Sequence, residues 1–187
     1  MMQTSREWRR PAGRARGGFT LIELLVSFSA LMVVVMGFSR MLLSSQMATN
    51  TAYEAALAKE AARSMIEVLK AAPLDTVYAR YNSSNNDNPG GMTSPGPNFA
   101  VSGLTAPADD ADGFPGQILF PEQNGQLSEL VTKPQYGWPM DMDRDGDPDG
   151  TANVSTTYKL LPVVVRVEWR SQGADSLIEF RTVLGGL

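Results

Sequence analysis

The sequence predicts an α+β fold in which one long N-terminal helix carries a small antiparallel β-sheet packed on its second half. Two observations predict it. An apolar run from Phe19 to Phe38 continues into residues that favour helix, and no proline interrupts them before Pro73. Near the C-terminus, residues 163–170 and 176–184 alternate between apolar and polar side chains with a period of two, as expected of paired strands with one buried face.

The first 38 residues divide into a basic segment and an apolar run. Residues 1–18 hold five arginines and one glutamate, a charge of +4, which leaves −8 for the rest because the whole chain carries −4. Residues 19–38 contain one ionisable side chain, Glu23, and as a helix they would extend roughly 30 Å, the thickness of a bilayer core. The positive-inside rule predicts a cytoplasmic N-terminus with the acidic remainder across the membrane. That negative charge disfavours nucleic-acid binding.

An ordinary secretory signal peptide and a plain single-pass anchor are the competing interpretations of this run. The run is longer than the 7 to 15 or so apolar residues of a signal peptide, and no small-x-small cleavage site follows it. A plain anchor has no need of Glu23, because a carboxylate at the centre of a bilayer costs on the order of 3 kcal/mol. Glu23 lies only one turn inside the run, where the cost is smaller, but it still requires a partner. Its presence therefore indicates a function.

The residues from Arg16 to Leu25, with Gly18 followed by Phe19 and Glu23, resemble the prepilin cleavage and methylation motif of type IV pilins and type II secretion pseudopilins. The resemblance implies that a prepilin peptidase cuts between Gly18 and Phe19 and methylates the new amine of Phe19. Cleavage would place an ammonium one helical turn from Glu23. If helices stack with an axial offset, Glu23 of one subunit can meet the amine of the preceding subunit, and we expect this pair to set the register of assembly.

Two further segments, Met65–Lys70 and Val163–Trp169, are loosely similar to PilV-like minor pilins and I-type minor pseudopilins. The resemblance implies a minor pilin or minor pseudopilin, a structural subunit of a type IV pilus or type II secretion filament. Its expected partners are other subunits, the prepilin peptidase and an inner-membrane assembly platform. We expect a single-pass protein of the bacterial inner membrane with a periplasmic domain, or a filament component. The alternative is a membrane-anchored adhesin or ligand-binding module that uses loop 82–116 as its ligand face.

The chain after the membrane run is expected to form one small domain. Residues 39–72 form the amphipathic half of the helix, whose apolar stripe is expected against the sheet and comprises Leu57, Ala61, Met65, Val68 and Ala72. Residues 73–187 form the globular part. Its expected features are the irregular loop 82–116, short strands at 117–121 and 127–132, and a C-terminal hairpin at 163–184 that turns over 171–175.

The sequence contains neither cysteine nor histidine. A structural disulfide and a Cys-based redox or zinc site are therefore impossible, and the commonest general base is absent. We expect no enzymatic activity.

An acidic segment before the hairpin predicts a calcium site. Asp141, Asp143, Asp145 and Asp149 match the first nine positions of an EF-hand loop, and Gly146 stands at the required turn. The twelfth position is Ala152, so the usual bidentate glutamate is missing and a closing ligand must come from a carbonyl or from another segment. The alternative is a merely acidic, solvated loop.

Two weaker features each have a functional interpretation and a purely structural one. Asp109, Asp110 and Asp112 form either a second acidic site or a soluble loop, and the sequence favours the loop. Trp138 is either a contact point for a partner or a core aromatic, and the sequence favours the core.

Overall fold

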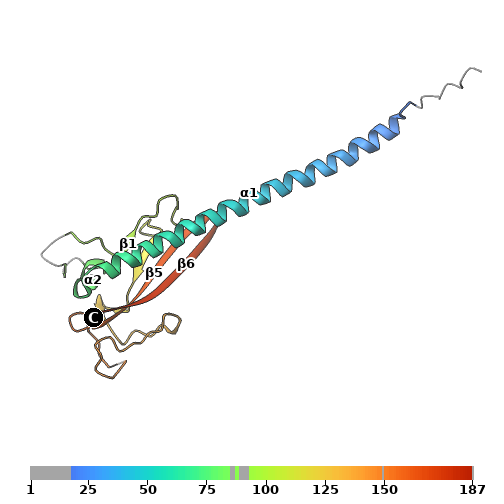
Figure 1. The fold of residues 1–187 in the computed structure, drawn as a ribbon. Helices are drawn as coiled ribbons and strands as arrows, with labels where there is room; N and C mark the ends of the chain where they lie inside the picture. The colour runs from blue at the N-terminus through green and yellow to red at the C-terminus, as the bar shows by residue number, and fades with distance from the viewer. Residues whose placement is uncertain (1–17, 85–86, 89–92, 149, 187) are drawn as a thin grey trace, which may run out of the picture. The chain divides into compact units, whose positions relative to one another are not determined.

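The computed structural model describes residues 18–84, 87–88, 93–148 and 150–186, and it confirms the α+β class. Two helices precede a set of antiparallel strands (Figure 1). The elements in chain order are α1 (Leu21–Ala71), α2 (Leu74–Tyr81), β1 (Asn98–Phe99), β2 (Gly116–Leu119), β3 (Glu122–Gln123), β4 (Gln126–Leu127), the 3-10 turn η2 (Pro134–Tyr136), β5 (Leu160–Ser171) and β6 (Ala174–Gly185). The chain divides into two compact units, Met1–Gln46 and Met47–Leu187, which are described separately.

The first unit contains the N-terminal part of α1. Thr20 begins this helix: its hydroxyl oxygen accepts a bond from the Glu23 amide at 3.3 Å, and its carbonyl accepts one from the Leu24 amide at 3.2 Å. Inside the apolar run, the hydroxyls of Ser29 and Ser39 donate to the carbonyls four residues earlier, each at 2.9 Å. These serines therefore satisfy their hydrogen bonds within the helix, as a lipid environment requires.

The second unit is built on a four-stranded antiparallel sheet in the order β1-β2-β5-β6, with β3 and β4 forming a separate pair. The β5–β6 hairpin is fully paired from Leu160 opposite Gly185 to Ser171 opposite Ala174. The predicted hairpin is confirmed, but its strands are longer and its turn is only two residues. Gln172 and Gly173 both have positive φ, +50° and +87°, as a type I′ turn requires. Such a turn follows the twist of the strands, so pairing continues up to it.

The core of this unit lies between the second part of α1 and the sheet, which lie side by side in Figure 1. Ala58, Ala62, Ile66 and Leu69 are the buried face of α1, and they belong to the same core cluster as the inward residues of β5, which are Val163, Val165, Val167 and Trp169. The alternation predicted for β5 is therefore confirmed.

The predicted stripe on α1 lies about one residue away from the most buried face, although Ala61, Met65 and Ala72 still pack against the core. Its members lie on the flank of the buried face, and Val68 is 46% exposed. Both candidate stripes are apolar at helical spacing, and only packing separates them. Two alanines, Ala58 and Ala62, stand where the sheet covers the helix, because a small side chain permits close approach of the backbones.

The tip of the hairpin is fastened to α1 by side-chain hydrogen bonds. The Gln172 amide donates to the Met47 carbonyl at 2.7 Å and to the Thr51 hydroxyl at 3.1 Å. The Trp169 indole donates to the Glu54 carboxylate at 3.3 Å.

Pro73 ends α1 as predicted, but α2 follows directly and was not predicted. This short helix buries Val77, Tyr78 and Tyr81 in the core. The Tyr158 hydroxyl donates to the Leu74 carbonyl at 2.6 Å, and burial raises the pKa of Tyr158 to about 12. The hydroxyl therefore remains a donor over the physiological pH range.

The segments between α2 and β5 are mostly irregular. Loop 82–116 lies partly outside the described residues, at 85–86 and 89–92, and its described part forms only β1 and the first residue of β2. The strand expected at 117–121 is confirmed as β2. The strand expected at 127–132 was wrong, because β4 ends at Leu127 and the chain turns at Glu129 and Leu130.

Candidate functional site

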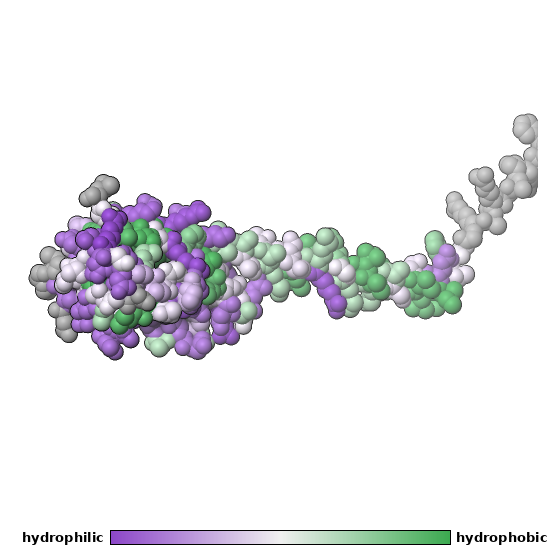
Figure 2. All heavy atoms as spheres, turned by 90° about the horizontal axis from the view of Figure 1, so that it is seen from below, coloured by the Kyte–Doolittle hydropathy of each residue, from purple (hydrophilic) through white to green (hydrophobic). Residues whose placement is uncertain are grey.

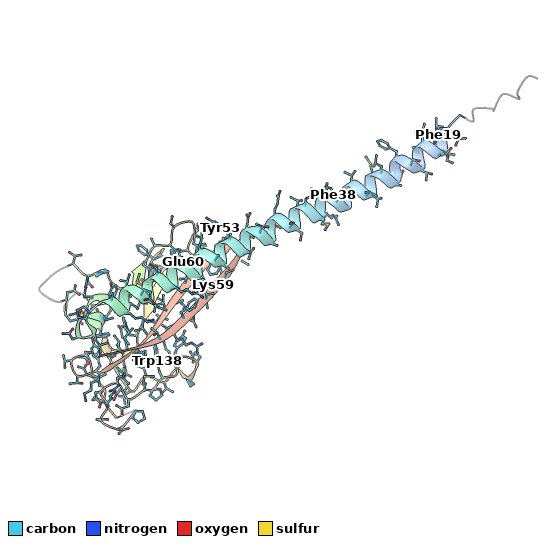
Figure 3. All side chains as sticks on the ribbon, viewed as in Figure 1. Phe19, Phe38, Tyr53, Lys59, Glu60 and Trp138 are labelled. Carbon is cyan, nitrogen blue, oxygen red and sulfur yellow. The ribbon has the colours of Figure 1, made fainter. Side chains whose placement is uncertain are left out.

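The predicted cleavage position lies in an exposed segment just before α1. Gly18 and Phe19 have no regular secondary structure, and Phe19 is 77% exposed (Figure 3). A Cβ atom added to Gly18 would meet nothing within 4 Å. Within the described part of the chain, a larger side chain would therefore fit at position 18. If glycine is required there, the requirement comes from a molecule that acts on this bond. Residues 1–17 of the predicted leader lie outside the described residues.

Glu23 lies in the first turn of α1, together with a residue that sequence reasoning missed. Thr20 caps the helix through the Glu23 amide, and the Thr-x-x-Glu spacing of a capping box is visible in the sequence. A carboxylate here also interacts favourably with the positive end of the helix dipole. The new amine of Phe19 would add a positive charge at that same end, which the dipole disfavours. In a chain cleaved before Phe19, Glu23 would supply a negative charge that offsets it.

The helix that follows is uncovered on every side within the first unit. Every large apolar side chain from Phe19 to Phe38 is more than half exposed (Figures 2 and 3). Within the described part of the chain, α1 is the one helix long and apolar enough to cross a membrane, a statement about length and composition. An apolar helix with no polar face fits a lipid environment or the interior of an assembly.

The predicted calcium residues are only partly brought together. Asp141 and Asp143 lie in one group with Glu129, in which a carboxylate oxygen of each residue lies within 4.8 Å of those of the other two. Asp145 is exposed, and its carboxylate accepts a bond from the Asp147 amide at 2.9 Å. Asp149 lies outside the described residues.

The loop itself is held by its own carboxylates. The Asp141 carboxylate accepts bonds from the amides of Asp145 at 3.2 Å and Gly146 at 3.0 Å. Gly146 has a φ of +100°, which favours glycine and explains why the turn is placed there. Asp141 and Asp143 are consequently half-buried on the side of the loop that meets Glu129.

Glu129 is the member of this group that sequence reasoning missed. It lies in the turn after β4, and its amide donates to the Thr151 carbonyl at 3.1 Å. One carboxylate oxygen, Oε1, accepts bonds from the amides of Met142 at 2.5 Å and Asp143 at 3.3 Å. The residue is 1% exposed, and the other oxygen, Oε2, is buried without a hydrogen-bond partner. The only hint in the sequence was an acid next to the apolar residues Leu130 and Val131.

The two weaker features behave as ordinary structure. Trp138 is 2% exposed, and its ring packs edge-on against Tyr136 with centroids 5.1 Å apart. Asp112 accepts a bond from the Phe114 amide at 2.8 Å, and Asp110 accepts one from the Asp112 amide at 3.3 Å. These contacts favour the core interpretation for Trp138 and a turn-stabilising role for the aspartates.

Comparison with known proteins identifies the N-terminal region. Residues 13–39 match the family model described as the prokaryotic N-terminal methylation motif, which includes Gly18, Phe19 and Glu23. No curated protein and no solved structure matches the chain. The motif and the long apolar helix together fit a single-pass, membrane-anchored protein. The chain therefore carries the prokaryotic N-terminal methylation motif, which supports its relation to the type IV pilins and type II secretion pseudopilins.

Proposed function

We propose that this protein is a minor pilin or minor pseudopilin, a structural subunit of a type IV pilus or type II secretion filament. One observation carries the proposal: the methylation motif leads directly into an apolar helix that is exposed on all sides and contains a single acid, Glu23. The motif implies processing by a prepilin peptidase and assembly with other pilin-like subunits. The inner-membrane assembly platform is the further partner we propose.

The second unit adds a surface that suits lateral packing. The flank of α1 that includes Leu57, Ala61, Met65 and Val68 forms an open groove with Phe99 and Val101 from the neighbourhood of β1. Tyr53, 64% exposed, lies nearer the start of this part of the helix (Figure 3). An incompletely covered apolar flank is expected of a helix that packs against other subunits. Because the chain contains no histidine or cysteine, we propose that its role is structural and not enzymatic.

Substitution of Glu23 tests the role in assembly. We expect Glu23→Val to insert into the membrane as well as the wild type, because removing a carboxylate from lipid is favourable for an isolated helix. It should nevertheless be depleted from sheared filaments, because the amine of a neighbouring subunit loses its partner in a medium of low dielectric. The measurement is an immunoblot of membrane and sheared-filament fractions from cells expressing each variant.

Two matched variants isolate the charge. Glu23→Gln keeps the hydrogen-bonding capacity of a capping box but not the charge, so it should assemble as poorly as Glu23→Val. Ser29→Ala removes a polar group that bonds only to its own helix, and it should assemble normally. If both Glu23 variants enter filaments like the wild type, Glu23 does not set register and the subunit proposal loses its main support.

The genes that neighbour this one would identify the machine that the subunit joins. Secretion ATPase and secretin genes without a retraction ATPase would assign it to secretion, and a retraction ATPase would assign it to a pilus. An adhesin that uses the same export route would tolerate the Glu23 substitutions while keeping ligand binding in the second unit, so the same experiment separates the two functions.

A further inference from the structure

We propose that Glu129, Asp141 and Asp143 form a calcium site in which Glu129, a residue outside the acidic loop, supplies the acid missing from that loop. One carboxylate oxygen from each of the three residues lies within 4.8 Å of those of the other two. Two oxygens on one calcium ion are separated by at most roughly 5 Å, twice the calcium–oxygen distance. The spacing therefore permits all three to bind a single ion.

The buried, unpartnered oxygen of Glu129 is the observation that distinguishes this group from an ordinary acidic patch. Its Oε2 atom is buried without a hydrogen bond, whereas Oε1 is held by two backbone amides. A buried carboxylate oxygen with no partner is costly, and buried charges in proteins are paired or coordinate metals. The two amides fix the position of this carboxylate, and one of its oxygens lies within 4.8 Å of a carboxylate oxygen of Asp141 and of Asp143.

The ligand chemistry favours calcium among common divalent ions. All three ligands are carboxylates, and the chain offers no histidine or cysteine that would favour a transition metal. Asp141 and Asp143 are only half-buried, which leaves room for water or backbone carbonyls to complete a shell of six to eight oxygens. Calcium tolerates such an irregular shell, whereas magnesium demands near-ideal octahedral geometry and gives up its water reluctantly.

The ion would reinforce a junction between two segments that hydrogen bonds already bring together, among them those from the Met142 and Asp143 amides to Glu129. Glu129 follows β4, and the loop bearing Asp141 and Asp143 leads into β5 through the Met142 carbonyl, which accepts bonds from the amides of Lys159 at 2.7 Å and Leu160 at 2.9 Å. Calcium bound at this point would tie the turn after β4 to the start of the hairpin. In a chain without cysteine, it would constrain this region as a disulfide does elsewhere.

The test uses the full-length protein in a nonionic detergent, first stripped of metal with a chelator. Calorimetric titration with calcium chloride should show saturable uptake of one ion per chain, with a dissociation constant in the weak extracellular range of roughly 10⁻⁴ to 10⁻³ M. Calcium should also raise the melting temperature, and magnesium should raise it much less. No uptake of calcium, or an equal response to magnesium, would overturn the assignment.

Matched variants locate the site. Glu129→Gln keeps an oxygen that can accept from Met142 and Asp143 but removes the charge, so the protein should fold and lose calcium uptake. Without calcium this variant should melt above the wild type, because three crowded carboxylates become two, and with saturating calcium it should melt below it. Asp143→Asn should also lose calcium uptake, and it serves as the test if Glu129→Gln folds poorly. Asp109→Asn removes an exposed acid elsewhere and should bind as the wild type does. Calcium uptake retained by both Glu129→Gln and Asp143→Asn would refute the proposal.

Discussion

Glu122 shows how a single side chain can make the second unit sensitive to pH. It lies in β3, and burial, followed by the nearby charge of Asp87, raises its pKa. The folded state therefore holds the proton of Glu122 more tightly than the unfolded chain does. Ionisation of this carboxyl disfavours folding, so its contribution to stability falls as pH rises from the unfolded pKa through the folded pKa.

We therefore expect Glu122→Gln to raise the melting temperature at pH 7, since the variant has no charge to desolvate. The difference should shrink as pH is lowered towards the ordinary range of glutamate, about 4.3, where the wild-type side chain is protonated as well. Thermal melts of both proteins at several pH values provide the measurement. Glu60→Gln, at an exposed position on α1 (Figure 3), is the control and should show no such trend. A gap that widens at low pH would contradict this account.

At the residue level, the sequence indicated which side chains lie close together only where a spacing rule applies. The Asp141 and Asp143 spacing located two members of the acidic group, because ligands on one loop recur at fixed intervals. Glu129 had no such signal, since its position depends on how the turn after β4 folds back onto the loop. Thr20 could have been found from its spacing to Glu23.

At the scale of elements, α1 shows that the apolar pattern of a helix does not by itself determine which face is buried. Leu69 is fully buried and its neighbour Val68 is 46% exposed, although the apolar pattern had favoured Val68. The sequence contained two adjacent apolar stripes, and the side chains of the sheet determine which one is covered. The hairpin, in contrast, was predictable because alternation assigns each strand residue to a face directly.

Alanine substitutions at these two positions measure the difference. Leu69→Ala should lower the free energy of unfolding by about 2–5 kcal/mol, because it removes buried methyl groups and leaves a cavity. Val68→Ala should change it by no more than about 0.5 kcal/mol. Urea denaturation followed by tryptophan fluorescence can report both, since Trp169 lies in the core. Similar losses for the two variants would mean that the predicted stripe was the buried one after all.

The α2 helix shows the limit of reading a proline as the end of helical structure. Pro73 ends α1, yet its φ of −58° suits the position just before a new helix. Leu74, Val77, Tyr78 and Tyr81 stand at the i, i+3, i+4 and i+7 spacing of an amphipathic helix, a pattern that could have been found in the sequence, and Val77, Tyr78 and Tyr81 are buried. The intrinsic helix propensity of these residues is weak, and their tertiary contacts stabilise the helix.

At the scale of the whole molecule, processing would redistribute charge as well as shorten the chain. The complete chain has a net charge of −4, and removal of residues 1–18 would remove the excess of arginine and leave an acidic protein. By the positive-inside rule we expect the arginines to orient the chain at insertion, whereas they would hinder burial of the new N-terminus in an assembly of apolar helices.

Mass spectrometry of the protein purified from its host should therefore show the loss of residues 1–18 and the addition of one methyl group at Phe19. Gly18→Val should leave the chain unprocessed, because a branched side chain would obstruct a peptidase, while the described structure has space for it. An intact leader in the wild-type protein, or a mature chain that begins beyond Ala30, would contradict the resemblance to prepilins.

The bonds that fasten the hairpin to α1 also bear on the order of folding. Those from Trp169 to Glu54 and from Gln172 to Met47 span 115 and 125 residues of sequence. Closing loops of that length costs entropy before any contact repays it, whereas β5 and β6 pair locally and therefore quickly. The buried face of α1, which comprises Ala58, Ala62, Ile66 and Leu69, consequently remains uncovered until the last strands have been synthesised. We therefore expect docking of a preformed hairpin onto α1 to be a slow, late step in the folding of this domain.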